Sequence, residues 1–482
     1  MLLLSLISSV KPLQVIGPKN PEISALTFDS RKVTPGSMFV AVRGTAVDGH
    51  SFIPLLEHSG VAAIVCEQLP DKIIPSITYV VVKDSSIALG LLSSEWFGHP
   101  SRKLKLVGVT GTNGKTTTAT LIYEMARLRG FKAGLLSTVC NYIDSTPVHA
   151  TQTTPDAYSI NELLARMVDE GCQYAAMEVS SHACVQHRIA GLQFAGGVFT
   201  NLTRDHLDYH KTVQAYLEAK KSFFDGLPRE AFALVNIDDK VGPVMVQNCD
   251  AKHYGYSLRT LTDFTGKILE SRLDGTLMSL NGHEVHTMFT GRFNAYNLTA
   301  VYGACCLLSW PEEDVLRHIS ELVPVAGRFQ AVRSPKGVVA IVDYAHTPDA
   351  VVNVLDTIVE VGPKRIITVV GCGGNRDKGK RPVMAAEAAK RSDILILTSD
   401  NPRFEEPRDI LADMEAGLDE EARANAMVVV DRREAIRTAA KLAEQGDVIL
   451  IAGKGHEDYQ EVKGVKHHFD DREEILAAFS EV

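Results

Sequence analysis

An apolar run that starts at Val107 leads directly into a loop of glycines and threonines with one lysine, VGVTGTNGKTTT. Backbone N–H groups of such a loop can surround phosphates, its lysine adds positive charge, and the hydroxyl after the lysine can hold Mg²⁺. The usual spacing, GxxxxGK(S/T), requires glycine at position 109, where this chain has valine. Because a predicted strand precedes the loop and a predicted helix follows it, we expect nucleotide phosphates to bind here. The alternative is a tight strand-to-helix turn with a surface lysine.

Two further predicted strands end on charged residues. The run YAAMEVSSH ends its strand on Glu178, and the run GGVFTNLTRDHLDYH places His206 just after the next strand. A carboxylate at a strand end beside a phosphate loop is a natural ligand for Mg²⁺, which prefers hard oxygens and keeps several waters. The alternative is that Glu178 serves a helix N-cap and that His206 is a structural imidazole. The neighbouring Asp205, Asp208 and His210 make the segment more polar than a structural histidine requires.

The last third of the chain carries four polar or glycine-rich segments, and each follows a predicted strand. They are DYAHTPD, GCGGNRDKGKRP, TSDNPR and AGKGHED, after strands expected at Val338–Asp343, Ile366–Val370, Ile394–Thr398 and Val448–Ala452. In open α/β sheets, ligands bind outside the carboxyl ends of the strands. Any one segment could be a turn with a helix cap. Four of them at one edge predict a binding face.

Strand and helix patterns alternate through most of the chain, which predicts an α/β protein with mostly parallel sheets. Residues Asp263–Thr290 are richer in turns, which is typical of an antiparallel excursion. A chain of 482 residues is expected to form about three domains. Breaker residues and changes of pattern favour limits at 1–99, 100–327 and 328–482.

The composition, 45% hydrophobic and 23% charged, is that of an ordinary globular protein. A formal net charge of −9 argues against a nucleic-acid partner. Eight cysteines without CxxC spacing indicate the buried thiols of a reducing cytoplasm, and not a zinc site or a disulfide framework. The start, MLLLSLISSV, lacks a basic segment, so we expect an amphipathic opening helix and not a secretory signal. No apolar run approaches the roughly 18 residues of a membrane span, so we expect a cytoplasmic protein with no membrane partner.

Eight ordered motifs between residues 29 and 459 carry a resemblance to a known family. They are GTNGKTT, MEVSSH, TNLTRDHLDYH, YLEAKKSFF, FNAYN, GRF, DYAHTPD and AGKGHE. Together they resemble the Mur ligases of peptidoglycan (cell wall) synthesis, and most closely those that add the third amino acid of the stem peptide. The resemblance implies a central P-loop-type domain with a mostly parallel sheet, a Rossmann-like C-terminal α/β domain and a small N-terminal α/β domain.

The resemblance also implies which residues hold ATP and the metal. Lys115 would contact the β- and γ-phosphates, while Thr116, Glu178 and His206 would hold Mg²⁺. Lys220 would be carbamylated, as N6-carboxylysine, and would help to hold a second Mg²⁺. The implied catalytic residues are Lys115, Glu178, His206, Lys220, Arg328 and Asp343. The implied ATP-binding residues are Gly111, Thr112, Asn113, Gly114, Lys115, Thr116, Thr117, Asn294, Asn297, Arg328 and His346.

The implied acid substrate is UDP-N-acetylmuramoyl-L-alanyl-D-glutamate, which we expect to contact the first two domains. Hydroxyl, amide and guanidinium groups suit such a polar, anionic sugar-peptide. The implied residues are Ser30, Thr45, Ala46, Val47, Gln152, Thr153, Thr154, Ser180, Gln186 and Arg188.

The string Asp400-Asn401-Pro402-Arg403 resembles the version found in family members that add meso-2,6-diaminopimelate. Diaminopimelate is lysine with an additional carboxylate at its far end, and a guanidinium binds a carboxylate in a bidentate manner. A buried Arg403 facing lysine would be unpaired or opposed by an ammonium, whereas the alternative is a solvated loop arginine. The implied diaminopimelate-binding residues are Arg376, Asp400, Asn401, Pro402, Arg403, Gly453 and Glu457.

The implied reaction forms an amide bond through an acyl phosphate, and it relies on positioning and charge stabilisation. We expect closure of the third domain over ATP to assemble the site, and we expect a monomer whose partners are these small molecules. Three alternatives stay open: an L-lysine-adding ligase of the same fold, a folylpolyglutamate synthetase, and a regulatory or transport P-loop ATPase. The last would hydrolyse ATP without an acid and an amine together.

Overall fold

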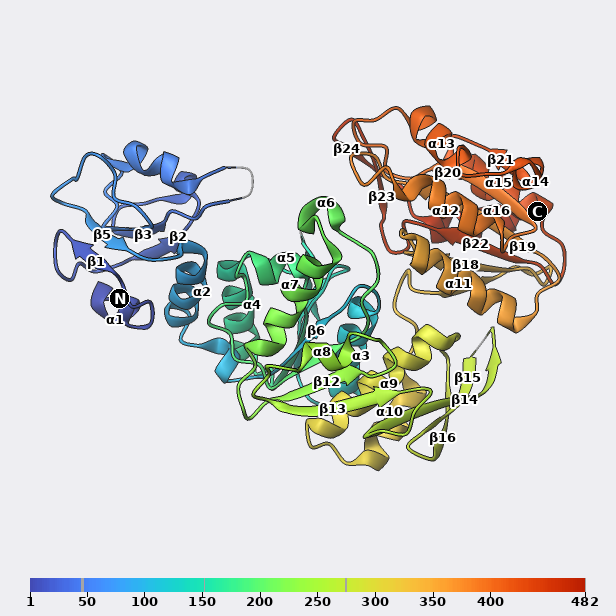
Figure 1. Cartoon of the computed structure of the whole chain (residues 1–482), viewed down its shortest axis with the longest axis horizontal. Coiled ribbons are helices and arrows are strands. Elements are labelled where there is room, and N and C mark those ends of the chain that lie inside the picture. Colours follow the sequence, from blue (N-terminus) through green and yellow to red (C-terminus); the bar gives the residue numbers. More distant parts are fainter. Residues whose placement is uncertain (45–46, 151, 274, 482) are drawn as a thin grey trace.

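The computed structural model contains three regions, each built around its own sheet (Figure 1). The structure describes residues 1–44, 47–150, 152–273 and 275–481. The N-terminus lies in the first region and the C-terminus in the third, on either side of the central region. The three sheets fall within the three predicted segments, and the α/β prediction is confirmed. The limits of the domains stay a prediction.

The first region has a five-stranded sheet whose strands are parallel except for β1 at one edge. The opening helix α1 (Leu3–Leu6) has two buried leucines and an exposed Leu4, so it is amphipathic but only one turn long. Helix α2 (Ser85–Trp96) covers the sheet and leads to the central region. In spatial order the strands are β1 (Gln14–Ile16), β5 (Thr78–Val81), β4 (Ala63–Cys66), β3 (Ser37–Val40) and β2 (Ala25–Thr27).

The central region has an eleven-stranded sheet with a parallel middle and antiparallel ends. The predicted excursion at 263–290 is confirmed as the antiparallel strands β14, β15 and β16. In spatial order the strands are β16 (His283–Thr287), β15 (Gly275–Leu280), β14 (Phe264–Arg272), β13 (Lys252–Ser257), β12 (Phe232–Asn236), β11 (Gly196–Phe199), β6 (Lys105–Thr110), β10 (Tyr174–Glu178), β7 (Ala133–Leu136), β8 (Asn141–Ile143) and β9 (Thr146–Val148).

Helices cover both faces of the central sheet. One core contains side chains of α3 (Lys115–Leu128), α9 (Arg292–Leu307) and α10 (Glu312–Glu321), and the other contains those of α4 (Ala157–Asp169) and α7 (Val213–Asp225). Short helices α5 (Ser181–Val185), α6 (Leu207–His210) and α8 (Gly242–Met245) follow strands β10, β11 and β12. Because β6 is buried on both faces, its sequence is a continuous apolar run and does not alternate.

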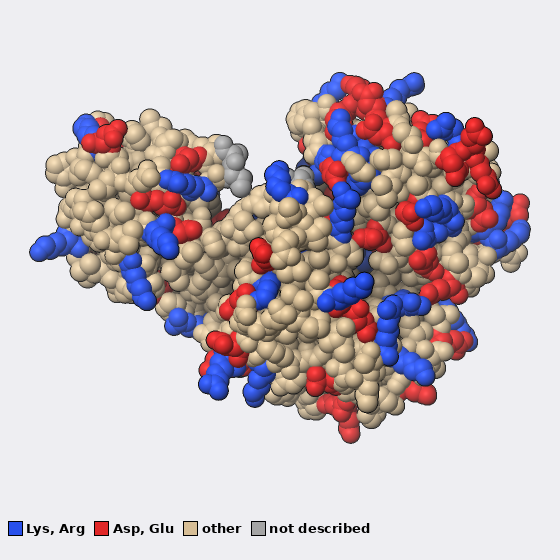
Figure 2. All heavy atoms as spheres, viewed as in Figure 1, with Lys and Arg blue, Asp and Glu red and all other residues tan. Residues whose placement is uncertain are grey.

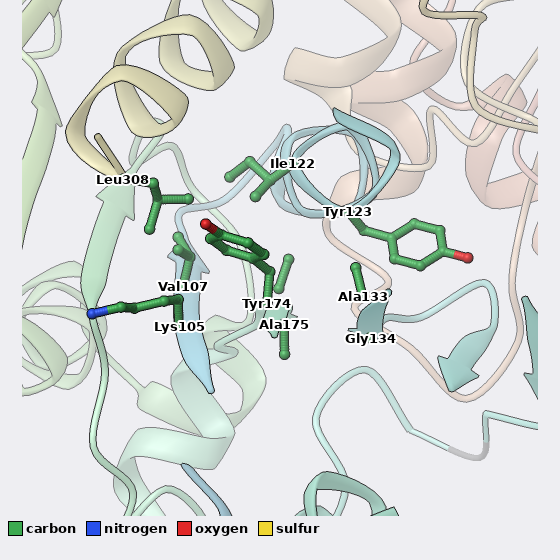
Figure 3. Close-up of a pocket in the computed structure, with 10 residues that line it drawn as sticks. Lys105, Val107, Ile122, Tyr123, Ala133, Gly134, Tyr174, Ala175 and Leu308 are labelled. Carbon is green, nitrogen blue, oxygen red and sulfur yellow. The ribbon is translucent and has the colours of Figure 1, made fainter. Parts of the chain in front are cut away.

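Figure 3 shows how α3 packs on the sheet. Ile122 and Tyr123 of α3 line the same small void as Val107, Ala133 and Ala175 of three neighbouring strands. The void has no room for a water molecule. This close packing holds the first turn of α3, where the phosphate loop ends, in a constant position relative to β6.

The third region has a six-stranded sheet that is parallel except for edge strand β17. Its order is β17 (Gln330–Arg333), β18 (Val339–Asp343), β22 (Val448–Ala452), β19 (Ile366–Cys372), β20 (Ile394–Ser399) and β21 (Ala426–Val428). Helices α11 (Pro348–Val361), α12 (Lys380–Ala389) and α13 (Pro407–Glu415) pack on one face, and α15 (Arg432–Leu442) and α16 (Asp471–Glu481) on the other. Helix α14 (Glu420–Ala424) and the hairpin β23 (Tyr459–Val462) and β24 (Val465–His468) complete the region.

Figure 2 shows basic and acidic side chains intermixed over the visible face, which is hollowed between the first and third regions. All eight cysteines are free thiols, and six of them are buried, as predicted. Within the described ranges, no helix combines the length and apolar character that crossing a membrane requires.

Candidate active site

One large cavity, with a volume of about 1060 Å³, lies between the central and third regions. Its lining includes the phosphate loop, the ends of β10 and β11, helix α7, and the loops after β18, β19, β20 and β22. The parallel register places the carboxyl ends of β18, β22, β19 and β20 at one edge, so the prediction that the four polar segments share an edge is confirmed. Among the described residues, the lining begins at Thr112, so the first region contributes none of it.

The glycine–threonine loop turns sharply between β6 and α3. Gly111 has φ +147°, and a Cβ there would lie 1.9 Å from Thr200 Oγ1, so only glycine fits. Lys115 begins α3 and its Nζ donates to the carbonyl oxygens of Gly111 (3.0 Å) and Thr112 (2.8 Å). Burial, the largest cause, lowers the pKa of Lys115. The predicted residues Thr112, Asn113, Gly114, Lys115, Thr116 and Thr117 all line the cavity.

Glu178, the last residue of β10, is 1% exposed and lines the cavity. Its Oε1 accepts hydrogen bonds from Ser137 Oγ (2.9 Å), Thr138 N (2.8 Å) and Thr138 Oγ1 (3.0 Å). Its Oε2 is buried and has no hydrogen-bond partner among the described residues. A buried carboxylate oxygen without a partner is costly unless a ligand satisfies it, so this atom is suited to a cation or to water on a cation.

Lys220 projects from α7 to the underside of the phosphate loop. Its side chain is 1% exposed, and its Nζ donates to Gly111 O at 2.7 Å. Burial, followed by the charge of Lys115, lowers the pKa of Lys220 well below its usual value. A lysine with a lowered pKa has more of its neutral, nucleophilic amine at neutral pH, which is the form that can react with CO₂.

The segment after β11 brings an imidazole and a carboxylate to the rim of the cavity. His206 has φ +52° and a 44% exposed side chain, and its Nε2 lies 3.4 Å from Asp205 Oδ2. Burial, the largest single cause, raises the pKa of Asp205, but His206, His346 and Lys115 together lower it more, so that the net shift is downward. The ring of His182, from the start of α5, lies 4.9 Å from that of His206.

The described residues include no cluster of three or more His, Cys, Asp and Glu side chains that could hold a metal. Mg²⁺ does not need one, because it retains water and takes phosphate oxygens, with only one or two carboxylates from the protein. The unpartnered Glu178 Oε2 in the same cavity as the Thr116 hydroxyl therefore fits a magnesium site that substrate completes.

The third region contacts the phosphate loop through Arg328. Its Nη2 donates to Thr116 Oγ1 at 3.1 Å, and its guanidinium lies 4.6 Å from the centre of the Tyr344 ring. Asp343, at the end of β18, is buried, and burial raises its pKa to about 6 against the opposing charge of Arg328. Burial likewise lowers the pKa of His346 to about 4. Arg328, Asp343, Tyr344 and His346 of the third region all line the cavity.

The two asparagines of α9 differ in position. Asn297 lines the cavity, and its Oδ1 lies 2.5 Å from where a Cβ on Gly114 would stand. Asn294 does not line the cavity. Its Nδ2 donates to Thr290 O at 2.9 Å, and its Oδ1 lies 3.4 Å from Asn297 Nδ2. Asn294 accepts a hydrogen bond from Asn297 Nδ2, and its contact with the nucleotide stays a prediction.

Most of the residues predicted for the acid substrate form one hydrogen-bonded group. Arg188 donates to Gln152 Oε1 (2.6 Å), Thr154 O (2.6 Å) and Gln186 Oε1 (3.0 Å). Thr154 Oγ1 donates to Glu178 O at 2.8 Å, which ties this group to the metal candidate. Six of the residues predicted for the acid substrate belong to the central region. Five of these line the cavity, namely Gln152, Thr153, Thr154, Ser180 and Arg188, whereas Gln186 does not.

The residues predicted in the first region lie apart from the cavity. Ser30 begins a turn of 3₁₀ helix, and Val47 is 55% exposed. Neither residue lines the cavity. Thr45 and Ala46 fall outside the described residues.

Arg403 lies at the third-region edge of the cavity with φ +52°. Its Nη1 donates to Gly374 O at 2.9 Å and its Nε lies 3.4 Å from Glu461 Oε2, so the guanidinium is already paired within the chain. Glu457 Oε2 accepts from Asn401 Nδ2 at 2.8 Å. The other predicted residues that line this edge are Arg376, Asp400 and Gly453, whereas Pro402 is buried and does not line it.

Several polar residues at or beside the cavity were not predicted from the sequence, and four of them contact predicted residues. Ser137 and Thr138 hold Glu178, Lys380 lines the cavity and donates to His346 O at 2.8 Å, and Lys454 is fully buried beside Glu457. Lys380 and Lys454 stand inside motifs that were identified, GNRDKGKRP and AGKGHED. Ser137 and Thr138 directly follow β7, a strand that the sequence analysis did not identify, so no signal in the sequence marked them.

Comparisons with known proteins follow the three regions. Sequence models match residues 22–90 (Mur ligase family, catalytic domain), 109–305 (Mur ligase middle domain) and 327–455 (Mur ligase, glutamate ligase domain). The chain is 58% identical, over the full length of both, to the UDP-N-acetylmuramoyl-L-alanyl-D-glutamate--2,6-diaminopimelate ligase of Bacteroides thetaiotaomicron. It is 61% identical to the protein of the same name from Parabacteroides distasonis, over 98% of each chain.

A solved structure of a UDP-N-acetylmuramoyl-L-alanyl-D-glutamate--2,6-diaminopimelate ligase matches this fold with a TM-score of 0.72 and 32% identity. The match covers 100% of this chain and 99% of that one. The fold and the family that the eight motifs predicted are thereby confirmed. The chain belongs to the Mur ligase family.

Proposed function

We propose that this protein is an ATP-dependent ligase that adds meso-2,6-diaminopimelate to UDP-N-acetylmuramoyl-L-alanyl-D-glutamate in peptidoglycan synthesis. One observation carries the proposal. A single cavity holds the phosphate loop, the unpartnered oxygen of Glu178 and the Asp400–Arg403 segment, so a phosphorylated acid and an amine can meet there. The names of relatives that are 58% and 61% identical support the same substrates.

In the proposed reaction, the γ-carboxylate of the substrate's D-glutamate attacks the γ-phosphorus of ATP, which forms an acyl phosphate and releases ADP. The unprotonated amine of diaminopimelate then attacks the acyl carbon, and inorganic phosphate leaves as the amide forms. Lys115, the loop N–H groups and Arg328 lie where they can stabilise the charge on the transferred phosphoryl group. Asn297 orients the loop, and Arg188 with its partners Gln152 and Thr154 orients the peptide.

We propose that Thr116, Glu178 and His206 hold Mg²⁺, and that a carbamate on Lys220 helps to hold a second ion. When bound, Mg²⁺ supplies positive charge that offsets the charge of the phosphates. The lowered pKa of Lys220, caused by burial and by Lys115, supports carbamate formation because the neutral amine is the reactive form. A carbamate would also replace one of two neighbouring cations with an anion, which removes their repulsion.

Arg403 supports diaminopimelate over lysine as the amino acid. Its guanidinium is partly buried, at 20% exposure, at the edge of the cavity, where a distal carboxylate could share or replace Glu461. Lysine would present an ammonium at the same place, which Arg403 repels. Arg376, Asp400, Asn401, Gly453 and Glu457 complete the proposed amino-acid subsite.

We propose domain limits at 1–99, 100–327 and 328–482, with Ser30 and Val47 of the first domain contacting the uridine nucleotide as the substrate reaches beyond the cavity. We also propose a monomer that acts in the cytoplasm. The eight free thiols and the use of ATP support that compartment.

One assay tests the function: release of phosphate from ATP with UDP-N-acetylmuramoyl-L-alanyl-D-glutamate and diaminopimelate, lysine or no amino acid. We expect release only when the acid and diaminopimelate are both present. Equal release with lysine would favour the lysine-adding alternative. Release without acid or amine would favour an ATPase, and release with a folate and glutamate would favour a folylpolyglutamate synthetase.

A further inference from the structure

A fully buried lysine lies directly behind the proposed amino-acid subsite. Lys454 follows β22 in the AGKGHED segment and has 0% exposure. Its Nζ donates to Asn401 Oδ1 at 3.2 Å and to Glu457 Oε2 at 3.1 Å. An ammonium is buried only where partners compensate its charge, so its neighbours explain its presence.

The partners of Lys454 are also bonded to each other. Asn401 Nδ2 donates to Glu457 Oε2 at 2.8 Å, which closes a triangle of three side chains. Because an ammonium can only donate, Lys454 requires the carbonyl oxygen of Asn401 on its own side and turns the amide NH₂ toward Glu457. Glu461 N donates to the same carbonyl oxygen at 2.9 Å, which supports this orientation.

The triangle joins two loops that are not neighbours in the sheet. Asn401 follows β20 and Lys454 follows β22, and β19 lies between these strands. The triangle therefore controls the spacing of the two loops, while Glu457 keeps its place in the cavity lining. A shift of either loop would break at least one of the three bonds.

A second carboxylate faces the same ammonium. Asp400 Oδ1 lies 3.6 Å from Lys454 Nζ, is buried, and has no hydrogen-bond partner among the described residues. Asp400 and Glu457 both line the cavity. With one cation for two carboxylates, the group has a net charge of −1, which is what one ammonium of a ligand can neutralise.

We propose that Lys454 is the positioning residue of the amino-acid subsite: it holds Asp400 and Glu457 as a half-neutralised pair that selects an amino acid with a second, distal ammonium. This proposal rests on the proposed function. Without Lys454, the two carboxylates would repel each other and Asn401 could rotate, so Glu457 would lose its fixed orientation. The subsite would then bind diaminopimelate weakly and would discriminate poorly against 2-aminopimelate, which has the distal carboxylate but no distal ammonium.

The test compares Lys454→Met, Glu457→Gln and the double variant in the phosphate-release assay. For Lys454→Met we expect the KM for diaminopimelate to rise roughly 10- to 100-fold, with the KM for ATP and the kcat changed less than about threefold. We also expect the preference for diaminopimelate over 2-aminopimelate to fall by about tenfold or more. Lys364→Met is the control, because Lys364 pairs with Glu444 on the exposed surface of the same region, and it should change none of these values.

The double variant tests the mechanism and serves if the single variant is unstable, because it removes both members of an ion pair. If Lys454 acts through the two carboxylates that it holds, its loss should matter less once Glu457 is neutral, so the KM of the double variant should lie well below the product of the two single increases. The proposal would be overturned if the two single increases in KM for diaminopimelate multiplied in the double variant. An unchanged KM for diaminopimelate in Lys454→Met, or equal rises in the KM for ATP and for diaminopimelate, would also overturn it. Failure of wild-type enzyme to release phosphate with diaminopimelate would instead overturn the proposed function.

Discussion

Two edges of the same cavity solve the problem of buried charge in opposite ways. At the phosphate edge (Lys115, Glu178 and Lys220), the buried Lys220 lies close to the partly buried Lys115, and a carboxylate oxygen lacks a partner among the described residues. At the amino-acid edge (Asn401, Arg403, Lys454 and Glu457), the charges are bonded to one another within the chain.

This difference indicates what each edge requires from its ligands. The phosphate edge lacks compensation until anions and a cation arrive, so we expect binding there to be coupled to strong changes in charge. The amino-acid edge is compensated within the chain except for one negative charge, which Asp400 and Glu457 share, so its main task is to exchange one set of partners for another. Substitutions should therefore have larger effects on turnover at the phosphate edge and larger effects on KM at the amino-acid edge.

The largest effect is expected from Lys115→Met. The substitution removes the ammonium nearest the loop, and we expect phosphate release to fall by about 10³-fold. Burial lowers the pKa of Lys115, so its charged form is disfavoured in the folded state, and the substitution should not lower the thermal unfolding midpoint. Activity within tenfold of wild type, measured on protein that unfolds normally, would contradict the importance of this edge.

Lys220→Met should lower turnover by about 10²-fold or more, with little change in the KM for diaminopimelate. The reason is loss of the proposed carbamate, which would be observed directly by ¹³C NMR of wild-type protein in labelled bicarbonate. Lys221→Met is the control, since the neighbouring Lys221 pairs with Asp225 and does not line the cavity. Absence of a carbamate signal from wild type, or its persistence in the Lys220 variant, would show that the modification was wrongly assigned.

Arg403→Ala should raise the KM for diaminopimelate by roughly 10- to 100-fold and leave the KM for ATP unchanged. Arg403→Lys should recover only part of the loss, because an ammonium cannot bind a carboxylate in a bidentate manner. The control is Arg433→Ala, which breaks a surface pair with Glu474 in the same region. Unchanged affinity in Arg403→Ala would place the distal carboxylate elsewhere.

The smallest effect concerns stability. Burial raises the pKa of Asp343 from 3.8 to about 6, so the folded state binds its proton more tightly than the unfolded state does. The protonated carboxyl therefore stabilises the folded state below about pH 4, and this stabilisation is lost as the pH rises through about 6. Asp343→Asn should therefore raise the free energy of unfolding at pH 7.5 by roughly 1–3 kcal/mol. Denaturant unfolding at pH 4 and pH 7.5 would measure it, and a variant less stable at pH 7.5 would contradict it.

Much of the site could be predicted because motif and element coincide. The loop at 111–117 follows a buried strand and begins a helix, so its chemistry and its position were visible together. Glu178 could be predicted for the same reason, because it ends a buried strand whose sequence is an apolar run. The roles of Lys220 and Arg403 came from family resemblance alone, since a lysine on a helix and an arginine in a loop have no distinctive pattern.

Other parts of the site could not be predicted because they depend on side chains distant in sequence. Asn294 and Asn297 stand in one motif, yet only Asn297 lines the cavity, because the rotation of α9 against the loop decides which face is presented. Lys454 stands in an identified motif, but its burial and its two partners depend on how β20 and β22 are spaced. Fully buried lysines are rare, so a sequence pattern gives no reason to expect one.

Local rules were sufficient for the alternation of strands and helices, the common edge of polar loops and the family, because hydrophobic periodicity and short motifs are properties of neighbouring residues. The pairing of charges required the folded molecule. Whether a lysine is protonated, or a carboxylate oxygen is left without a partner, depends on burial and on groups brought together from separate strands, and these are set only when the sheets pack.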